Sequence, residues 1–415
     1  METPAPHPDH IPENHSVKKQ VLVSVLILSL LVGATVLFIL YGKGYRFDFQ
    51  KGEPKIAKTG LLQVDSTPVG AQVYINDHLT TATDDDINLT PGKYKVKIAK
   101  DGYNDWQKDV EITKEVVTSI DATLWPKAPT LQSISTFGVE SVVADPSGTK
   151  LAFKIASNSA KRNGIYLFDM TARTFPVLAG QSNSTQLVDD TTDVFSTAEI
   201  TWSPDGKQIL ASTSGSASSP TYYLLKTDTF NATPQDVTAT LLGFMDLWDT
   251  QKKDKAAARL KSLKPAVQKF AQSNFKIISW SPDDSRILYQ ASESAEMPIF
   301  LTPRRIGNNL LYERRDLEKD AIYVYDLKED VNTRVSEPME NPELFTWFPD
   351  SRHVLLVHDK QIDIIDDDGA NKTTLYGGPF IDHYAYPWPD GSKIVILTNL
   401  GNQNTSPTLY TIALK

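Results

Sequence analysis

The sequence predicts a mainly β protein that is anchored by one N-terminal transmembrane helix. Three observations predict this fold class: a long apolar run near the N-terminus, a stretch of period-two alternation after it, and a turn motif that recurs five times in the remainder. We divide the chain, in order, into a disordered tail at 1–19, a transmembrane helix at 20–41, a stalk at 42–59, a small β-sandwich at 60–126 and a β-propeller at 128–415.

The apolar run at 21–41 contains no charged residue. At a rise of about 1.5 Å per helical residue, it matches the roughly 30 Å hydrocarbon core of a bilayer. A signal peptide has a shorter apolar core, about 7–15 residues, followed by a small-residue cleavage site. No A-x-A pattern follows this run, so we expect a retained membrane anchor. The Pro-rich, polar residues before it are typical of a disordered tail, and the Lys- and Gly-rich residues after it predict a stalk.

The composition excludes several classes of protein. The 415 residues carry a formal charge of −9, whereas a nucleic-acid binder shows a basic footprint, so we expect no nucleic-acid partner. The chain has no cysteine, and it therefore forms no disulfide, thiolate metal site or cysteine nucleophile. It also lacks G-x-S-x-G, H-E-x-x-H and Walker sequences, so no motif predicts a cofactor, a metal or a catalytic residue.

Apolar and polar residues alternate from residue 61 to about 125, which is the signal of half-buried strands. Within 93–98, Tyr94, Val96 and Ile98 share one face of a strand, and three lysines share the other. The lysine row has two interpretations, a binding stripe for an anionic polymer or a solvated outer face. We favour the solvated face, because lysine also protects sheet edges from pairing.

This stretch resembles the PEGA domain. Pro68, Gly70 and Ala71 fill the Pro-x-Gly-Ala turn, and the other matching points are Ser66, 73–75, Pro91-Gly92-x-Tyr94 and Gly102-Tyr103-x-x-Trp106. Asp77-His78 departs from the family's usual glycine turn, which leaves the local turn type open. The resemblance covers about 65 residues. It implies a small β-sandwich without catalytic residues, of a kind found in surface-exposed and envelope proteins of prokaryotes.

The charges beside the anchor do not decide its orientation. Lys18 and Lys19 precede the span, while Lys43, Arg46 and Lys51 follow it. Large domains translocate largely regardless of flanking charge. Because the domain after the anchor resembles an envelope type, we expect a single-pass protein of the cell membrane with its C-terminal domains outside the cytoplasm.

A Trp-Ser-Pro-Asp-Gly motif at 202–206 recurs at 280–284 and 347–351, and more weakly at 144–148 and 387–391. Proline presets φ, Asp bonds the backbone two residues on, and Gly tolerates positive φ, so the motif predicts a hairpin turn. The prolines at 146, 204, 282, 349 and 389 are separated by 58, 78, 67 and 40 residues. An apolar strand follows each turn and a second strand follows most, which is the pattern of propeller blades of about 40–50 residues.

The repeats therefore predict one propeller of five blades, or six if an insertion hides a degenerate blade. We expect the segment 130–135 to close the ring by pairing with the last blade, because circular sheets hide their edges. The pattern resembles the TolB-like propellers, whose blades carry the same Ser-Pro-Asp-Gly turn and Ile-Tyr-x-x-Asp strand end, over about 280 residues. The shared residues are structural and imply a fold rather than a function.

The turn aspartates, and the run Asp366-Asp367-Asp368-Gly369, suggest calcium ligands. No EF-hand spacing is present, so we expect these aspartates to cap turns instead.

A helical insertion is predicted at about 235–275. Apolar residues recur at helical spacing from Leu260 to Phe270, and Pro265 starts a second helix as its first residue. The polar face is basic and offers a contact surface for anionic lipid, wall polymer or an acidic partner. The residues of this surface are Lys252, Lys253, Lys255, Arg259 and Lys261. The other interpretation, a helical decoration with a solvated lysine face, is the one we favour.

Two functions remain open. The first is a non-enzymatic surface protein, in which a PEGA-like spacer presents the propeller as a platform for an envelope protein or polysaccharide. The second is a hydrolase or lyase with its site in the central channel, built from residues scattered across the blades. Converging carboxylates or histidines in the channel favour the enzyme, whereas an aromatic and apolar lining favours binding. We favour the first function and predict no catalytic residues.

Overall fold

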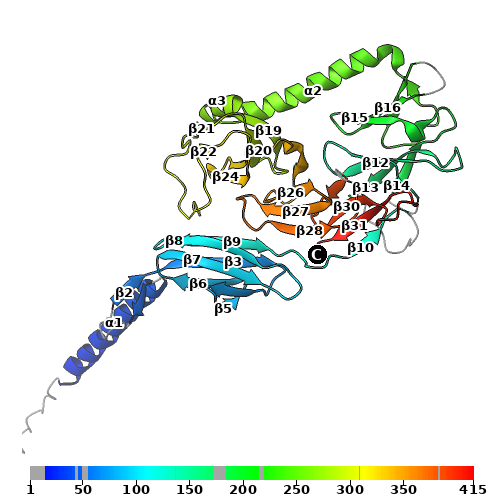
Figure 1. The fold of residues 1–415 in the computed structure, drawn as a ribbon. Helices are drawn as coiled ribbons and strands as arrows, with labels where there is room; N and C mark the ends of the chain where they lie inside the picture. Colours follow the sequence, from blue (N-terminus) through cyan, green and yellow to red (C-terminus); the bar gives the residue numbers. More distant parts are fainter. Residues whose placement is uncertain are drawn as a thin grey trace, which may run out of the picture.

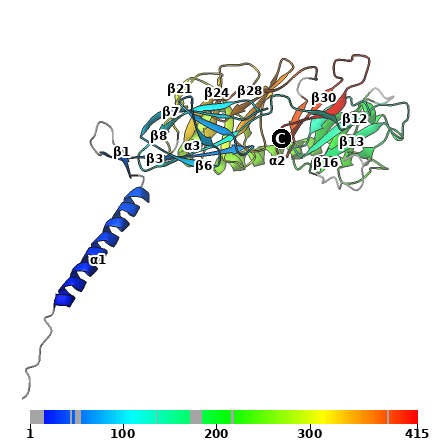
Figure 2. The same cartoon turned by 90° about the horizontal axis from the view of Figure 1, so that it is seen from below.

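The computed structural model describes residues 15–42, 45–48, 55–135, 137–171, 184–214, 219–307, 309–381 and 384–415. Strands dominate this part of the chain, as predicted. A long N-terminal helix projects from a small β domain, which lies against a larger array of sheets (Figures 1 and 2).

The N-terminal helix α1 (His15–Gly42) contains the apolar run. Its segment Lys19–Ile39 is, within the described residues, the one helix long and apolar enough to cross a membrane. The side chains at 19–39 are all exposed, so no described part of the protein shields them from water. The helix begins at His15, so residues 15–19 are helical rather than part of the predicted tail, whose other residues lie outside the described chain. In the predicted stalk, β1 (Tyr45–Asp48) pairs with β2 (Lys55–Lys58).

The small β domain consists of two sheets that face each other across an apolar core. The first sheet has the order β5-β4-β7-β8 and the second β6-β3-β9. Their strands are β3 (Gly60–Thr67), β4 (Gln72–Ile75), β5 (His78–Ala82), β6 (Asp85–Leu89), β7 (Gly92–Ala99), β8 (Trp106–Ile112) and β9 (Val117–Thr123). In β7, Val96 and Ile98 are fully buried in the core, which confirms the predicted alternation. Asn76 and Asp77 both have positive φ, so a tight hairpin turn forms there without glycine.

Five four-stranded antiparallel sheets, here called sheets I to V, follow in the described chain. Sheet I contains β11 (Val142–Ala144), β12 (Lys150–Ile155), β13 (Gly164–Asp169) and β14 (Ser184–Val188). Sheet II contains β15 (Glu199–Trp202), β16 (Gln208–Thr213), β17 (Thr221–Lys226) and β18 (Gln235–Asp236). Sheet III contains β19 (Phe275–Trp280), β20 (Arg286–Ala291), β23 (Ile322–Asp326) and β24 (Val331–Ser336). Sheet IV contains β25 (Phe345–Trp347), β26 (His353–His358), β27 (Gln361–Asp366) and β28 (Thr373–Gly377).

Sheet V joins the two ends of this region. It contains β10 (Leu131–Ser133), β29 (Ala385–Pro387), β30 (Lys393–Thr398) and β31 (Thr408–Ala413). The order is β10-β31-β30-β29, and Leu131 lies opposite Ile412. This is the pairing that we predicted for the segment 130–135.

In sheets I to IV the repeated turns connect the first two strands, and in sheet V the repeated turn connects β29 and β30. One position in each copy has positive φ: it is occupied by Gly148, Gly206, Asp284, Ser351 and Gly391. In the copy of sheet II, Asp205 Oδ1 accepts hydrogen bonds from Ser203 Oγ at 2.7 Å and from the backbone N–H of Lys207 at 3.1 Å. The turn aspartates therefore have the capping role that we predicted for them.

Buried apolar clusters connect the sheets in a series. One cluster joins sheets I and II, and others join III with IV, IV with V, and V with I. Among the described residues, no such cluster joins sheet II with sheet III. This junction, here called the seam, interrupts the ring that the other four junctions begin.

The helical insertion crosses the seam (Figure 1). It consists of α2 (Leu241–Lys261) and α3 (Pro265–Asn274), and Pro265 is the first residue of α3, as predicted. Trp248 of α2 packs on Leu210 and Leu224 of sheet II, whereas α3 packs on sheet III through its buried apolar side chains. The middle of α2, at 249–258, is exposed. The insertion thus covers the free apolar face on each side of the seam without closing it.

The remaining short elements lie in the connections. They are β21 (Ala295–Glu296), β22 (Asp316–Leu317) and the 3-10 turns Phe195–Thr197, Thr238–Thr240 and Pro342–Leu344.

Candidate functional site

A cavity of about 1350 Å³ lies between sheets I to V and α2. Prolines of all five repeated turns contribute to its wall: Pro146, Pro204, Pro282, Pro349 and Pro389. The repeated motif therefore does more than reverse the chain, because its five copies surround one space.

Four aromatic side chains contribute to the wall on the side of sheets III, IV and V. Phe275, Trp280, Trp347 and Tyr386 line the cavity. The indole Nε1 of Trp347 donates a hydrogen bond to the carbonyl of Ser279 at 3.4 Å. This bond ties the inner strand of sheet IV to that of sheet III.

Sheets I and II are joined in the same way. The indole of Trp202 donates to the carbonyl of Val143 at 3.0 Å. In both cases the acceptor is the residue just before the tryptophan position of the preceding turn copy. Trp280 occupies the corresponding position at the seam, but its indole has no hydrogen-bond partner within the described residues. Instead, the guanidinium of Arg259 lies 5.9 Å from its ring centroid and pairs with Asp284 at 2.9 Å.

The structure places the predicted basic surface in two environments. Lys252, Lys255 and Arg259 line the cavity, whereas Lys253 and Lys261 do not. The reason is helical geometry, because each residue turns the side chain by about 100° and spacings of three and seven return to one face. The sequence contained this periodicity. It could not show which face of α2 points into the array.

The cavity lining carries few acidic groups. Asp145 and Glu343 are its two carboxylates. Asp145 is buried, and its Oδ1 accepts hydrogen bonds from the backbone N–H groups of Thr149 at 2.8 Å and Lys150 at 2.7 Å, so it caps its own turn. Glu343 is exposed. The described lining thus offers aromatic surface and positive charge, which suit binding, and no converging pair of an acid and a base.

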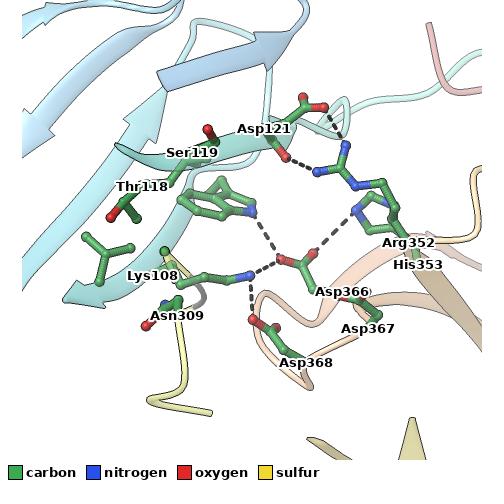
Figure 3. A pocket seen from close by; sticks show the side chains of 14 residues that line it. Lys108, Thr118, Ser119, Asp121, Asn309, Arg352, His353, Asp366, Asp367 and Asp368 are labelled. Atoms are coloured by element: carbon green, nitrogen blue, oxygen red, sulfur yellow. Dashed lines mark hydrogen bonds and ion pairs between the residues drawn. The ribbon is translucent and has the colours of Figure 1, made fainter. Parts of the chain in front are cut away.

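A second, smaller cavity of about 160 Å³ lies between the small β domain and sheet IV (Figure 3). Its centre is the aspartate run that suggested calcium. Lys108 of β8 pairs with Asp366 at 3.2 Å and with Asp368 at 2.5 Å. The indole of Trp106 also donates to Asp366, at 3.1 Å. The run therefore binds side chains of the small domain.

Sheet IV adds a histidine to this cluster. His353 is buried, with Nδ1 2.6 Å from Asp350 and Nε2 3.4 Å from Asp366. Burial lowers the pKa of His353, but hydrogen bonds to these two carboxylates outweigh it and raise the pKa to about 9. Burial also opposes ionisation of Asp366, yet His353 and the charge of Lys108 lower its pKa to about 2.

Asp367 behaves differently from its neighbours. Burial raises the pKa of Asp367 to about 6, although Arg286 lies at 2.8 Å, and the charge of Asp368 adds to the increase. At the edge of the cluster Arg352 binds Asp121 of β9. Together these contacts fix the small domain on sheet IV. Sequence reasoning missed them, because Trp106 and Asp366 are 260 positions apart.

Comparisons with known proteins identify one domain of the chain. Residues 59–128 match the family model of the PEGA domain. No curated protein matches the chain.

Three of the matching solved structures have low sequence identity to this chain. A protein described as TolB from Agrobacterium tumefaciens has 17% identity and a TM-score of 0.21, with 66% of this chain and 77% of that chain covered. TolB from Acinetobacter baumannii has 16% identity and a TM-score of 0.21, with 78% of this chain and 60% of that chain covered. A prolyl endopeptidase has 10% identity and a TM-score of 0.23, with 83% of this chain and 50% of that chain covered. At these TM-scores the likeness supports no argument about function. Residues 59–128, with their two packed sheets, are a PEGA domain.

Proposed function

We propose that this chain is a non-enzymatic surface protein, anchored by α1, whose PEGA domain holds a binding platform outside the cytoplasm. The platform is a β-propeller of five blades, sheets I to V, that is open at the seam. Its binding site is the central cavity, and its partner carries negative charge. The central observation is that Lys252, Lys255 and Arg259 border a cavity whose walls also include aromatic and proline side chains.

The contacts between the PEGA domain and sheet IV favour a rigid support rather than a flexible tether. The Lys108 ammonium and the Arg352 guanidinium each bind carboxylates across the interface between the domains. Breaking a buried pair leaves an uncompensated charge, which costs several kcal/mol, about 3–5. The orientation of the cavity relative to the PEGA domain is then set by this interface.

The other predicted function, a hydrolase or lyase, needs groups that exchange protons with a substrate. Of the two cavity carboxylates, Asp145 already accepts two backbone hydrogen bonds. Glu343 alone supplies no acid–base pair. We therefore propose binding without catalysis.

Photo-cross-linking in cells tests the proposal. A photoreactive amino acid replaces Thr346, which is exposed and lines the cavity. In a matched protein it replaces Lys319, which is also exposed but lies outside the cavity lining. We expect a discrete adduct of higher mass from position 346 and none from 319. No adduct at 346, or identical adducts at both positions, would reject the cavity as the binding site.

A further inference from the structure

At the seam the inner strands of two sheets each have a free edge, and one of these strands, β19, lines the cavity. β15 pairs only with β16, and β19 pairs only with β20, so each innermost strand has one free edge within its sheet. At the other junctions an indole hydrogen bond or an apolar cluster joins neighbouring inner strands. At the seam the indole of Trp280 is without a partner in the described chain, and the residue that corresponds to the acceptors Val143 and Ser279 is Thr201, which is exposed.

The free edge of β19 is the longer of the two. This strand spans Phe275–Trp280, against Glu199–Trp202 for β15. Except for the carbonyl of Ser279, which accepts the indole of Trp347, no inter-sheet hydrogen bond engages its backbone in the described residues. A free strand edge is a template for an extended polypeptide, because backbone groups provide affinity and alternate side chains provide specificity.

The positive charge at the seam favours an acidic partner. Lys252 and Lys255 are exposed on the cavity face of α2, and neither has an ion pair within the described residues. The chain as a whole carries a charge of −9, so an anionic partner is attracted here and repelled over much of the remaining surface.

The size of the cavity favours a segment of a polymer over a small molecule. The cavity volume of about 1350 Å³ exceeds the roughly 300–1000 Å³ of sites for small molecules. A polysaccharide satisfies the charge and the size, but it cannot pair with a strand edge. A polypeptide satisfies all three observations.

We propose that the seam binds an extended acidic segment of a partner protein. The segment adds to the free edge of β19, its carboxylates meet Lys252 and Lys255, and the indole of Trp280 donates to its backbone. This inference rests on the proposed function, since it assigns the class of partner to the cavity.

The test uses the full chain in nanodiscs of neutral lipid and a fluorescent peptide of about ten residues with alternating Glu and Val, long enough to span the edge when extended. The control peptide has Gln in place of Glu. We expect the acidic peptide to bind, more weakly at high salt, and the control peptide to bind at least tenfold more weakly. Two variants with the same loss of charge separate the cavity face from the rest of α2. Lys252→Ser with Lys255→Ser should weaken binding about tenfold, whereas Lys253→Ser with Lys261→Ser should change it less than twofold.

A third variant tests the strand edge. Trp280→Phe should weaken peptide binding several-fold and should lower the unfolding temperature less than Trp202→Phe does, because the Trp280 indole makes no hydrogen bond within the described residues. Absence of peptide binding, or equal effects of the two lysine pairs, would overturn the inference. Binding of acidic polygalacturonate instead of the peptide would also overturn it. In those cases an adduct from position 346 would still support the proposed function, so the two failures are distinguishable.

Discussion

Raising the pH from 6.5 to 9 should lower the unfolding free energy of the protein through His353 of sheet IV. His353 has a pKa of about 9 in the folded protein, against 6.5 for an ordinary histidine. A raised pKa stabilises the fold fully below pH 6.5, and this stabilisation is lost as the pH rises through 9. At about 1.36 kcal/mol per pKa unit, the unfolding free energy should fall by about 3 kcal/mol.

Other groups of the cluster have little effect in this interval. The pKa of Asp366, about 2, lies far below it, so Asp366 is ionised throughout. The pKa of Asp367, about 6, lies just below it, so Asp367 is mostly ionised at pH 6.5 and its remaining titration changes the unfolding free energy little. The pKa of His358 is also raised, chiefly by its hydrogen bond to Asp363, and it contributes with the same sign. A variant is therefore needed to isolate His353.

The assay is urea unfolding of the full chain in mild detergent, followed by tryptophan fluorescence at several pH values. Trp125 reports on the interface, because its ring centroid lies 5.2 Å from that of His353. His353→Gln keeps one hydrogen-bond donor but does not titrate, so its unfolding free energy should fall much less between pH 6.5 and 9. Equal slopes for the two proteins, or a wild-type stability that rises over this interval, would refute the assigned charge of His353.

Lys108→Met removes the ammonium that Asp366 and Asp368 share, although Asp366 keeps its contact with His353, and it should cost about 3–5 kcal/mol in the same assay; a loss below 1 kcal/mol would contradict a buried ion-pair cluster. Trp202→Phe removes an inter-sheet hydrogen bond and should cost about 1–2 kcal/mol, whereas Trp280→Phe should cost less than half as much; equal losses would argue for a closed seam. Gly164→Ala should destabilise strongly, because φ is +121° and the new Cβ would overlap a carbonyl of its own sheet. Gly243→Ala has open space in α2 and should stabilise by up to about 1 kcal/mol; thermal unfolding that ranks these two glycine variants in the opposite order would contradict the described backbone.

The sequence predicted the parts of the fold that local chemistry determines. The apolar run, the alternation in β7 and the proline–aspartate turns are each specified by residues close together in the chain. The pairing of the segment 130–135 with β31 was also predictable, because a sheet edge at the start of a repeat array needs a partner.

The seam was not predictable from the same signals. An interval of 78 residues between Pro204 and Pro282 is compatible with a hidden sixth blade or with an insertion. The helical periodicity of 241–274 does not reveal which sheet each end of the insertion packs on. Trp248 docks on sheet II and α3 on sheet III, which only the tertiary structure shows. The basic residues were identified, but their division between Lys252 and Lys253 depends on the rotation of α2. Asp366 binds partners that belong to the PEGA domain. The aspartate run by itself does not reveal these partners, and it suggested calcium instead.

The most direct test of the account is whether the cavity faces the outside of the cell. The chain has no cysteine, so one introduced thiol can be labelled without background. Lys255→Cys places that thiol on the cavity face of α2, and Glu2→Cys places it before the anchor. A membrane-impermeant maleimide added to intact cells should label position 255 and should label position 2 only after the membrane is opened. Labelling of position 2 in intact cells, with position 255 protected until lysis, would contradict an anchored protein that presents its cavity outside the cytoplasm.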